Sequence, residues 1–275
     1  MLLASLQKPW DRVCNGGSRG EVDAMVRKIV LCAAVVATVF FVGCGGEEKE
    51  CVPVTVEAQT VEIITEDSVT LVGTWFGVPN SRASIVCLPA LTHSRGTWAS
   101  TAQQFAASGW SVLTVDLRDQ GDSQMPAGAS PVWVGNDTLR ALAYYIKDVK
   151  AAVAFVRSKA PGAKVVVLGA GIAGYCGLHE AVADPTVAAV ALFSPPESSR
   201  LTTPAIMAEY GDRPLLIMTE LPAEAIRTTP RTLDSWIGRG SVIEIKEQVP
   251  RPPLRLENKA AAVDFLNRWI KAAVR

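Results

Sequence analysis

The sequence predicts an α/β protein with a mostly parallel sheet, helices on both faces, no large lid and an antiparallel hairpin at its start. Short apolar runs rich in β-branched residues alternate with segments of helical periodicity, as in parallel β-α-β units. These runs are apolar throughout, as expected for strands covered on both faces. Two alternating segments, 60–65 and 68–75, precede them and are joined by Glu66 and Asp67, which predicts the hairpin.

The later strands are predicted from the continuous apolar runs. In chain order they cover residues 84–88, 111–116, 165–168, 187–193, 214–218 and 241–245. Only about 20 residues separate strand 187–193 from strand 214–218, which is too few for a lid domain. We therefore expect the top of the sheet to be open or covered only by loops.

The helices are predicted from apolar spacings of three and four residues. They cover residues 98–108, 140–159, 172–183 and 259–274. Gly109 ends the first helix, and Pro161 with Gly162 ends the second. The second helix places five apolar residues on one face: Leu142, Ile146, Val149, Val153 and Val156. The last helix has a similar stripe: Phe265, Leu266, Trp269, Ile270 and Ala273.

The stretch 164–174 reads K-V-V-V-L-G-A-G-I-A-G and joins a strand to a helix through a glycine-rich turn. Gly169, Gly171 and Gly174 match the G-x-G-x-x-G pattern of dinucleotide-binding proteins, in which the backbone approaches a pyrophosphate. That pattern also needs an acidic residue at the end of the next strand to hold the ribose. Here a Ser-Pro-Pro sequence follows that strand, and Glu197 comes only after it. The context therefore disfavours a dinucleotide site.

The same stretch also matches a nucleophile elbow, G-x-S-x-G, with its serine replaced. In hydrolases this motif holds a serine on a strained strand-to-helix turn, with its Oγ exposed above the sheet. Gly169 takes the position of the first glycine, Gly171 that of the serine and Ala173 that of the second glycine. We favour this interpretation over a dinucleotide site or a plain turn in another α/β fold.

A second motif, at residues 116–123, reads D-L-R-D-Q-G-D-S, close to D-x-R-G-x-G-x-S with Asp119 in place of the first glycine. With the elbow, and with L-F-S-P at 192–195 and Y-G-D-R-P at 210–214, it makes the chain resemble bacterial α/β-hydrolases of the dienelactone-hydrolase and small-esterase type. The resemblance covers roughly residue 60 to the C-terminus. It implies an α/β-hydrolase fold, a Ser-His-acid triad and an oxyanion loop.

The catalytic positions that the resemblance implies are degenerate. Gly171 stands at the nucleophile position and has no side chain. The oxyanion loop of the family begins with a histidine, but this chain has Pro89-Ala90, and proline lacks a backbone N–H. The acid is expected near Glu220, a weak candidate. The catalytic histidine is expected within residues 246–258, which contain none.

Loss of the serine or the histidine of a triad costs about 10⁶ in rate, so we expect no esterase activity by the usual route. The chain has two histidines, His93 and His179. His93 adjoins Ser94, and with Asp119 or Asp122 this pair is the alternative, a displaced ester-hydrolase site. His179 lies on the elbow helix, where we expect a packed or surface side chain.

The elbow of an inactive hydrolase could still bind a ligand. The helix that begins at Ile172 keeps free N–H groups and a positive dipole end, so Gly171 and Ile172 are a possible site for a carboxylate or another small anion. An interaction role, with an exposed apolar patch, is the other non-enzymatic hypothesis.

No cofactor and no metal are predicted. Cys51, Cys87 and Cys176 have no metal-ligand spacing, and we expect Cys87 and Cys176 to be buried. The 27 basic and 27 acidic residues balance, which disfavours a nucleic-acid partner.

Residues 25–43 have the basic start, apolar run and small-residue end of a secretory signal. The uncharged run, 29–42, is shorter than the about 20 residues that span a bilayer. The sequence F-V-G-C at 41–44 resembles the bacterial lipobox, which implies that Cys44 becomes the mature N-terminus and carries several acyl chains, palmitate among them. Several chains give stable membrane anchoring.

The domain prediction follows from these features. Residues 1–24 are a mis-called extension with Met25 as the start, 25–43 the signal peptide, 44–58 the anchor and tether, and 59–275 the α/β-hydrolase-like domain. The protein is thus predicted to be anchored to a membrane of the bacterial envelope through Cys44, with its domain outside the cytoplasm. Its predicted partner is a small molecule or an envelope protein.

Overall fold

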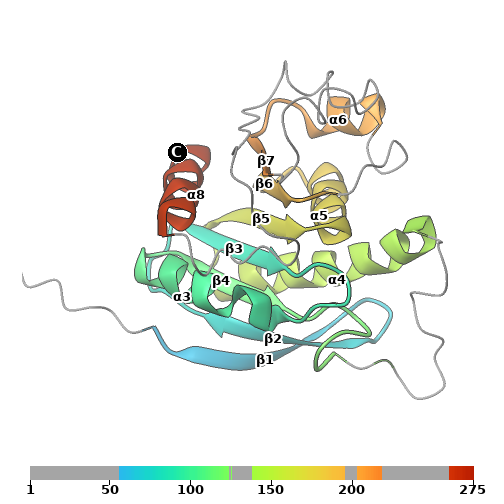
Figure 1. The fold of residues 1–275 in the computed structure, drawn as a ribbon, viewed down its shortest axis with the longest axis horizontal. Coiled ribbons are helices and arrows are strands. Elements are labelled where there is room, and N and C mark those ends of the chain that lie inside the picture. The colour runs from blue at the N-terminus through green and yellow to red at the C-terminus, as the bar shows by residue number, and fades with distance from the viewer. Residues whose placement is uncertain (1–55, 124, 126–137, 196–202, 219–259) are drawn as a thin grey trace, which may run out of the picture. The chain divides into compact units, whose positions relative to one another are not determined.

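The computed structural model describes residues 56–123, 125, 138–195, 203–218 and 260–275. Its centre is a seven-stranded sheet of order β1-β2-β4-β3-β5-β6-β7 (Figure 1). The strands are β1 (Ala58–Ile64), β2 (Thr70–Phe76), β3 (Ala83–Leu88), β4 (Ser111–Val115), β5 (Lys164–Ala170), β6 (Val187–Phe193) and β7 (Leu215–Met218). β2 pairs antiparallel with β1 and β4, and all other pairs are parallel. The predicted mostly parallel sheet and its N-terminal hairpin are confirmed.

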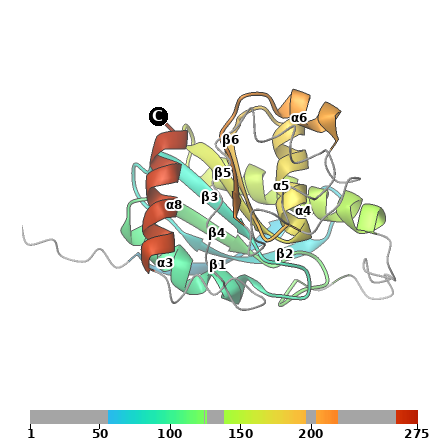
Figure 2. The ribbon, with the colours of Figure 1, turned by 45° about the horizontal axis from the view of Figure 1, so that its top comes forward.

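Helices lie on both faces of the sheet (Figure 2). They are the 3₁₀ turn η1 (Arg95–Trp98) and the α-helices α3 (Ala99–Ala107), α4 (Thr138–Lys159), α5 (Ile172–Ala183), α6 (Pro204–Tyr210) and α8 (Ala260–Ala273). α4 and α5 cover one face, and α3 and α8 cover the other.

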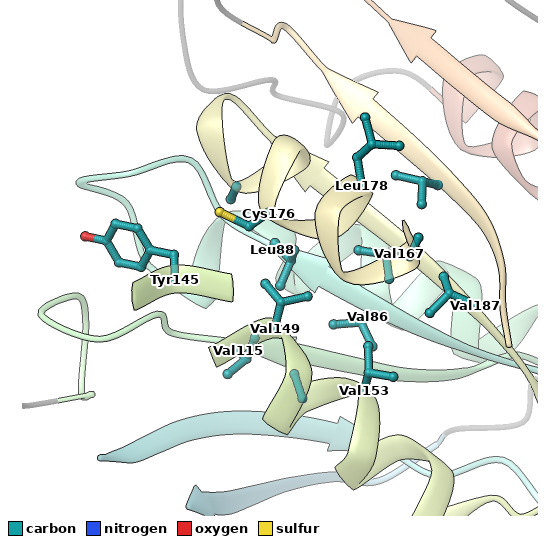
Figure 3. Close-up of a cluster of buried hydrophobic side chains, with 14 of the residues drawn as sticks. Val86, Leu88, Val115, Tyr145, Val149, Val153, Val167, Cys176, Leu178 and Val187 are labelled. Atoms are coloured by element: carbon teal, nitrogen blue, oxygen red, sulfur yellow. The ribbon is translucent and has the colours of Figure 1, made fainter. Parts of the chain in front are cut away.

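The core consists of two clusters because side chains alternate along each strand. On β3, Val86 and Leu88 pack with α4 and α5, whereas Ile85 and Cys87 pack with α3 and α8. Figure 3 shows the first cluster, in which residues of α4 and α5 face residues of β3, β4 and β5. The apolar faces predicted for the second and the last helix are the faces that these clusters bury.

The connection between β6 and β7 differs from the prediction, because its described part contains the short helix α6. Thr203 caps α6 by accepting a hydrogen bond from the N–H of Ile206, at 3.3 Å, and a proline opens the first turn. Gly211 ends the helix with φ of 71°. A seven-residue helix is too short to show helical periodicity in the sequence, and its cap is the main signal for it.

Several predicted features fall outside the described residues. They are the signal segment 25–43, Cys44, Cys51, Glu220, the strand 241–245 and the segment 246–258. Among the helices that the structure describes, none combines the length and the apolar character needed to cross a membrane.

Candidate functional site

β5 leads into α5 through Gly171, at the sharp turn that the elbow interpretation predicts. Gly171 has φ of 58° and ψ of −132°, a conformation that L-residues rarely adopt. Its N–H donates to the carbonyl of Phe193, on β6, at 2.8 Å, and its carbonyl accepts from the N–H of Gly174 at 3.2 Å. The backbone therefore holds the position where a hydrolase presents its serine.

The other two glycines of the motif let strand and helix approach each other closely. A Cβ on Gly169 would lie 2.5 Å from the Cα of Gly174, and a Cβ on Gly174 would lie 2.8 Å from the carbonyl oxygen of Gly169. Ala173, at the position of the second glycine of the elbow, is fully buried in the core. All three glycines of G-x-G-x-x-G thus have a role in the elbow itself, without a bound dinucleotide.

The loop after β3 faces the bare position of Gly171. A Cβ built on Gly171 would have one neighbour within 4 Å among the described residues, the Cβ of Ala90 at 3.7 Å. Pro89 is buried, and the carbonyl of Ala90 accepts from the N–H of His93 at 3.0 Å. The structure therefore brings the predicted oxyanion loop and the elbow together.

The residues of the displaced alternative lie on neighbouring loops. The ring nitrogen Nδ1 of His93 is 3.2 Å from the carbonyl oxygen of Leu91. Ser94 caps η1 without a side-chain capping bond. The carboxylate of Asp122 accepts from Nη2 of Arg95 at 2.8 Å. His93 Nδ1 and the Asp122 carboxylate thus contact groups other than the Ser94 hydroxyl.

Two further site residues lie on α5. Ile172 is its first residue and is half-buried. His179 lies two turns further on and is also half-buried.

Ser194 is a site residue that the sequence analysis did not single out. It directly follows Phe193, whose carbonyl binds Gly171, and it has φ of 42°. Its N–H donates to the carbonyl of Met218 at 2.7 Å, whereas its buried Oγ finds no hydrogen-bond partner among the described residues. The feature of the sequence that could have identified Ser194 is its position directly after the strand next to the elbow strand. Ser194 thus adds a buried hydroxyl directly after the residue that binds the elbow backbone.

Asp116, the first residue of the second motif, holds the loop after β4. Its buried carboxylate accepts from the N–H of Arg95 at 2.5 Å and of Asp122 at 2.9 Å, and pairs with the Arg95 guanidinium. A Cβ on Gly121, which has φ of 52°, would lie 2.2 Å from this carboxylate. The Oγ of Ser123 donates to the backbone carbonyl of Asp116 at 2.7 Å. The motif therefore fixes the shape of the loop.

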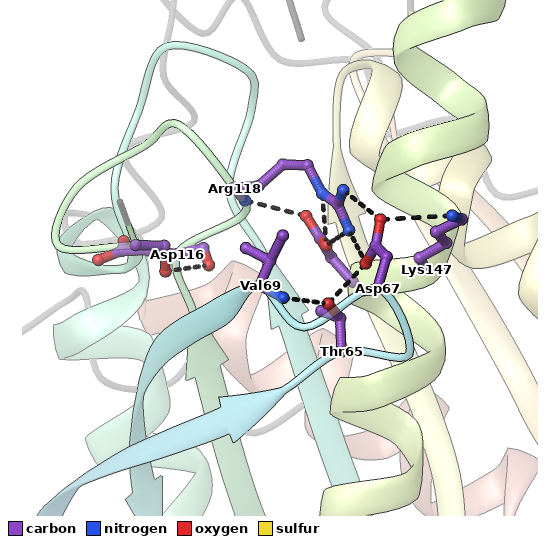
Figure 4. Close-up of polar contacts among 8 residues, drawn as sticks. Thr65, Asp67, Val69, Asp116, Arg118 and Lys147 are labelled. Atoms are coloured by element: carbon purple, nitrogen blue, oxygen red, sulfur yellow. Dashed lines mark hydrogen bonds and ion pairs between the residues drawn. The ribbon is translucent and has the colours of Figure 1, made fainter. Parts of the chain in front are cut away.

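Arg118 of the same motif joins three segments in a buried network (Figure 4). Its Nε donates to Asp148, on α4, at 2.8 Å, and its Nη1 and Nη2 donate to Asp67, in the β1–β2 turn, at 2.8 and 2.9 Å. Asp67 also accepts from Thr65 at 2.6 Å and from Lys147 at 3.3 Å. Because both carboxylates bind the guanidinium, this motif residue cross-links the scaffold.

The two carboxylates of this network differ in pKa. The hydrogen bonds from Arg118 hold the pKa of Asp67 well below its usual range. Burial raises the pKa of Asp148 to about 6, although Arg118 opposes that shift. Burial also raises the pKa of Cys87 and Cys176, whose thiols are free and buried as predicted.

A hollow of about 370 Å³ lies next to the loop after β4, over β2 and β4. The cation in its lining is Arg95, whose Nε donates to Thr74 at 3.2 Å and whose Nη atoms bind Asp116 and Asp122. The charged groups of this hollow are therefore already paired with one another. In the described part of the chain, no group of three or more His, Cys, Asp or Glu side chains is placed to hold a metal ion.

A family model described as serine aminopeptidase, S33, matches residues 79–232, which is more than half of the chain. The elbow and the motif at 116–123 both lie within that match. A comparison with curated proteins found no match.

Several solved structures are similar over most of the chain. The Pyrococcus furiosus esterase Pf2001 has a TM-score of 0.60 and 19% identity, covering 84% of this chain and 97% of that one. DcsB, solved with a substrate analogue, has a TM-score of 0.59 and 16% identity, covering 79% and 99%. An α/β hydrolase from Novosphingobium aromaticivorans has a TM-score of 0.58 and 16% identity, covering 78% and 99%. At such identities these likenesses show the fold, and the expected α/β-hydrolase fold is confirmed; the narrower dienelactone-hydrolase resemblance stays a prediction.

Proposed function

The chain belongs to the serine aminopeptidase S33 family of α/β-hydrolases, and from this premise we propose that it is a member without hydrolase activity that binds a small anionic molecule at the former active site. The observation that carries this proposal is Gly171. It has the backbone angles of the elbow and occupies the turn between β5 and α5, but it offers no nucleophile. A covalent acyl-enzyme route needs a hydroxyl or thiol at that point.

The absence of a base in the expected segment of the sequence supports the same conclusion. Residues 246–258 contain no histidine, and the chain has only His93 and His179. His179 is on α5, two turns from the elbow, and His93 contacts the carbonyl of Leu91. Since triad members act as a unit, restoring one of them does not restore the rate.

The proposed ligand is a carboxylate or a similar small anion. The first turn of α5 has the positive end of the helix dipole at Gly171, and the N–H groups before Gly174, whose own N–H donates to Gly171, are of the kind that a helix leaves unpaired. The methyl group of Ala90 lies 3.7 Å from the place of a Cβ on Gly171 and so borders the proposed site. These features offer hydrogen-bond donors without an acid-base pair, which suits binding rather than turnover.

The proposed location is a membrane surface of the bacterial envelope, with Cys44 as the anchor. The support is the lipobox-like sequence at 41–44 that follows a basic and then an apolar segment. Mass spectrometry of the mature protein should find an acylated N-terminal cysteine, and Cys44→Ala should release the protein from membranes. An unmodified N-terminus upstream of residue 44 would contradict this anchor.

The activity test uses p-nitrophenyl esters of short and medium chain length together with a serine-reactive fluorophosphonate probe. We expect hydrolysis at the buffer rate and no labelling. Turnover above the buffer rate that is lost in His93→Ala or Ser94→Ala would instead establish the displaced site. If neither turnover nor ligand binding is found, the result would favour a role in protein–protein interaction.

The binding test uses thermal unfolding with acetate, butyrate and benzoate at constant ionic strength. We expect stabilisation that Ala90→Leu removes, because the larger side chain fills the space over Gly171. Ala154→Leu is the matched control, since Ala154 is exposed on α4. Equal ligand effects in all three proteins would contradict a site at the elbow.

A further inference from the structure

A second hollow lies at the opposite edge of the sheet from the elbow. The elbow is at the carboxyl end of β5, whereas a groove of about 700 Å³ opens where β5 and β6 begin. Its walls also include Arg213 and the ends of α4 and α8. Because the two sites lie at opposite ends of the same strands, this groove is independent of the proposed elbow site.

The groove gathers positive charge from four separate segments. Its lining contains Arg157, Lys164, Arg213 and Arg275, and none of its described lining residues is acidic. Asp184, which pairs with Arg157, offsets one of these four charges. The formal charge of the whole chain is zero, so the excess at this edge is a local feature.

Two of the cations are held in place by the protein. The Nε of Arg213 donates to the carbonyl of Tyr210 at 2.8 Å and its Nη1 to that of Val187 at 3.0 Å, while its guanidinium lies 4.4 Å from the centre of the Tyr210 ring. Arg157 is held by Asp184 and by the hydroxyl of Thr186. Fixed guanidinium groups lose little freedom when a ligand binds.

The other two cations are available to a ligand. Lys164 and Arg275 are exposed, and no ion pair among the described residues involves either side chain. Gly162, in the lining, has no atom of another described residue, apart from its chain neighbours, within 4 Å of the place of a Cβ. The groove therefore combines two fixed guanidinium groups with two cations that have no ion pair among the described residues. Its volume is larger than a single carboxylate would fill.

We propose that this groove binds phosphate-bearing anions, either a free polyphosphate or the headgroup of an anionic phospholipid. Guanidinium groups match phosphate oxygens in a two-pronged geometry, and ammonium groups add point charges. A ligand with several negative charges can engage all four cations at once, whereas a single carboxylate can engage at most two. This makes multivalent phosphate the chemistry that the groove fits.

The test is calorimetric titration of the full chain in an uncharged detergent at low ionic strength. One arm uses tripolyphosphate, and the other uses bis(glycerophospho)glycerol, the headgroup of cardiolipin without its acyl chains, which carries two phosphate charges. Lys164→Gln and Arg275→Gln should each weaken binding by about fivefold, from the loss of one charge near the ligand. Tighter binding in the first arm would identify a free polyphosphate, and tighter binding in the second a lipid headgroup.

Lys271→Gln is the matched control, because Lys271 is an exposed cation of α8 outside the groove lining. It should leave the affinity unchanged, and all variants should keep the thermal unfolding of the parent. Absence of binding in both arms would overturn the proposal. So would an equal loss of affinity in Lys271→Gln and Lys164→Gln, since that result would mean nonspecific charge attraction.

Discussion

The protonation of Glu180 offers a quantitative test of the packing under the elbow helix. Glu180 lies on α5 with 4% of its side-chain surface exposed. Burial first, and then the charge of Asp184, raises its pKa from 4.5 to about 7, although Lys150 and Arg157 oppose the shift. The folded state therefore binds this proton more tightly than the unfolded state does.

The sign and size of the effect follow from linkage. A raised pKa in the folded state means that the contribution to stability is fully present below pH 4.5 and is lost as the pH rises through about 7. At about 1.4 kcal/mol per pKa unit, the loss amounts to about 3 kcal/mol. Glu180→Gln keeps the shape of the acid and removes its charge. It should be nearly neutral at pH 4.5 and stabilise the protein by up to about 3 kcal/mol at pH 8.5.

The assay is urea unfolding of both proteins at pH 4.5 and pH 8.5. Comparison of the two proteins cancels the titration of Asp148, whose raised pKa of about 6 is common to both. Glu62→Gln is the control for the substitution itself, because the Glu62 side chain is exposed on β1. The reasoning is refuted if Glu180→Gln changes the free energy of unfolding by the same amount at pH 4.5 and at pH 8.5.

Three further predictions concern other parts of the site and its scaffold. Gly171→Ser should lower the free energy of unfolding by about 1–3 kcal/mol, because a backbone φ of 58° strains a residue that has a side chain. The variant should not gain esterase activity. Unchanged denaturant unfolding, or a large gain in p-nitrophenyl ester turnover, would contradict this. Arg118→Ala should lower the free energy of unfolding, measured with urea, by about 3–5 kcal/mol, because it leaves the buried carboxylate of Asp148 without its cation. The double variant Arg118→Ala with Asp148→Asn should recover part of that loss. Cys87 and Cys176 should not react with a maleimide in the folded protein, because both are buried and their pKa values are raised; fast labelling of either, in mass spectrometry, would show that the core opens.

The strands and long helices could be predicted because each has its own local pattern. The β-branched run before Gly169 and the apolar face of the helix ending at Lys159 lie within single elements, and the structure places both as predicted. The glycine at the elbow could also be identified, since the turn depends on residues close together in the chain.

The polar scaffold could be found only in part. The motif at 116–123 identified Arg118, but its partners lie far along the chain: Asp67 is 51 residues away and Asp148 is 30. From the sequence, Asp67 was a turn residue, and Asp148 lay in a helix without a stated role. Ion pairs between distant segments have no spacing rule, so the structure is needed to join them.

The structure also shows how this hydrolase fold keeps its shape with a glycine at the nucleophile position. The loops around the elbow are held by Asp116 and Arg118, whose contacts do not involve the nucleophile position. The turn itself is held by backbone hydrogen bonds of Gly171, which a serine would make equally. Replacing a strained serine with glycine therefore removes strain and costs the scaffold nothing, while the helix N-terminus above it stays available for a ligand. Likeness to esterases is therefore evidence for the shape of the site and not for its activity.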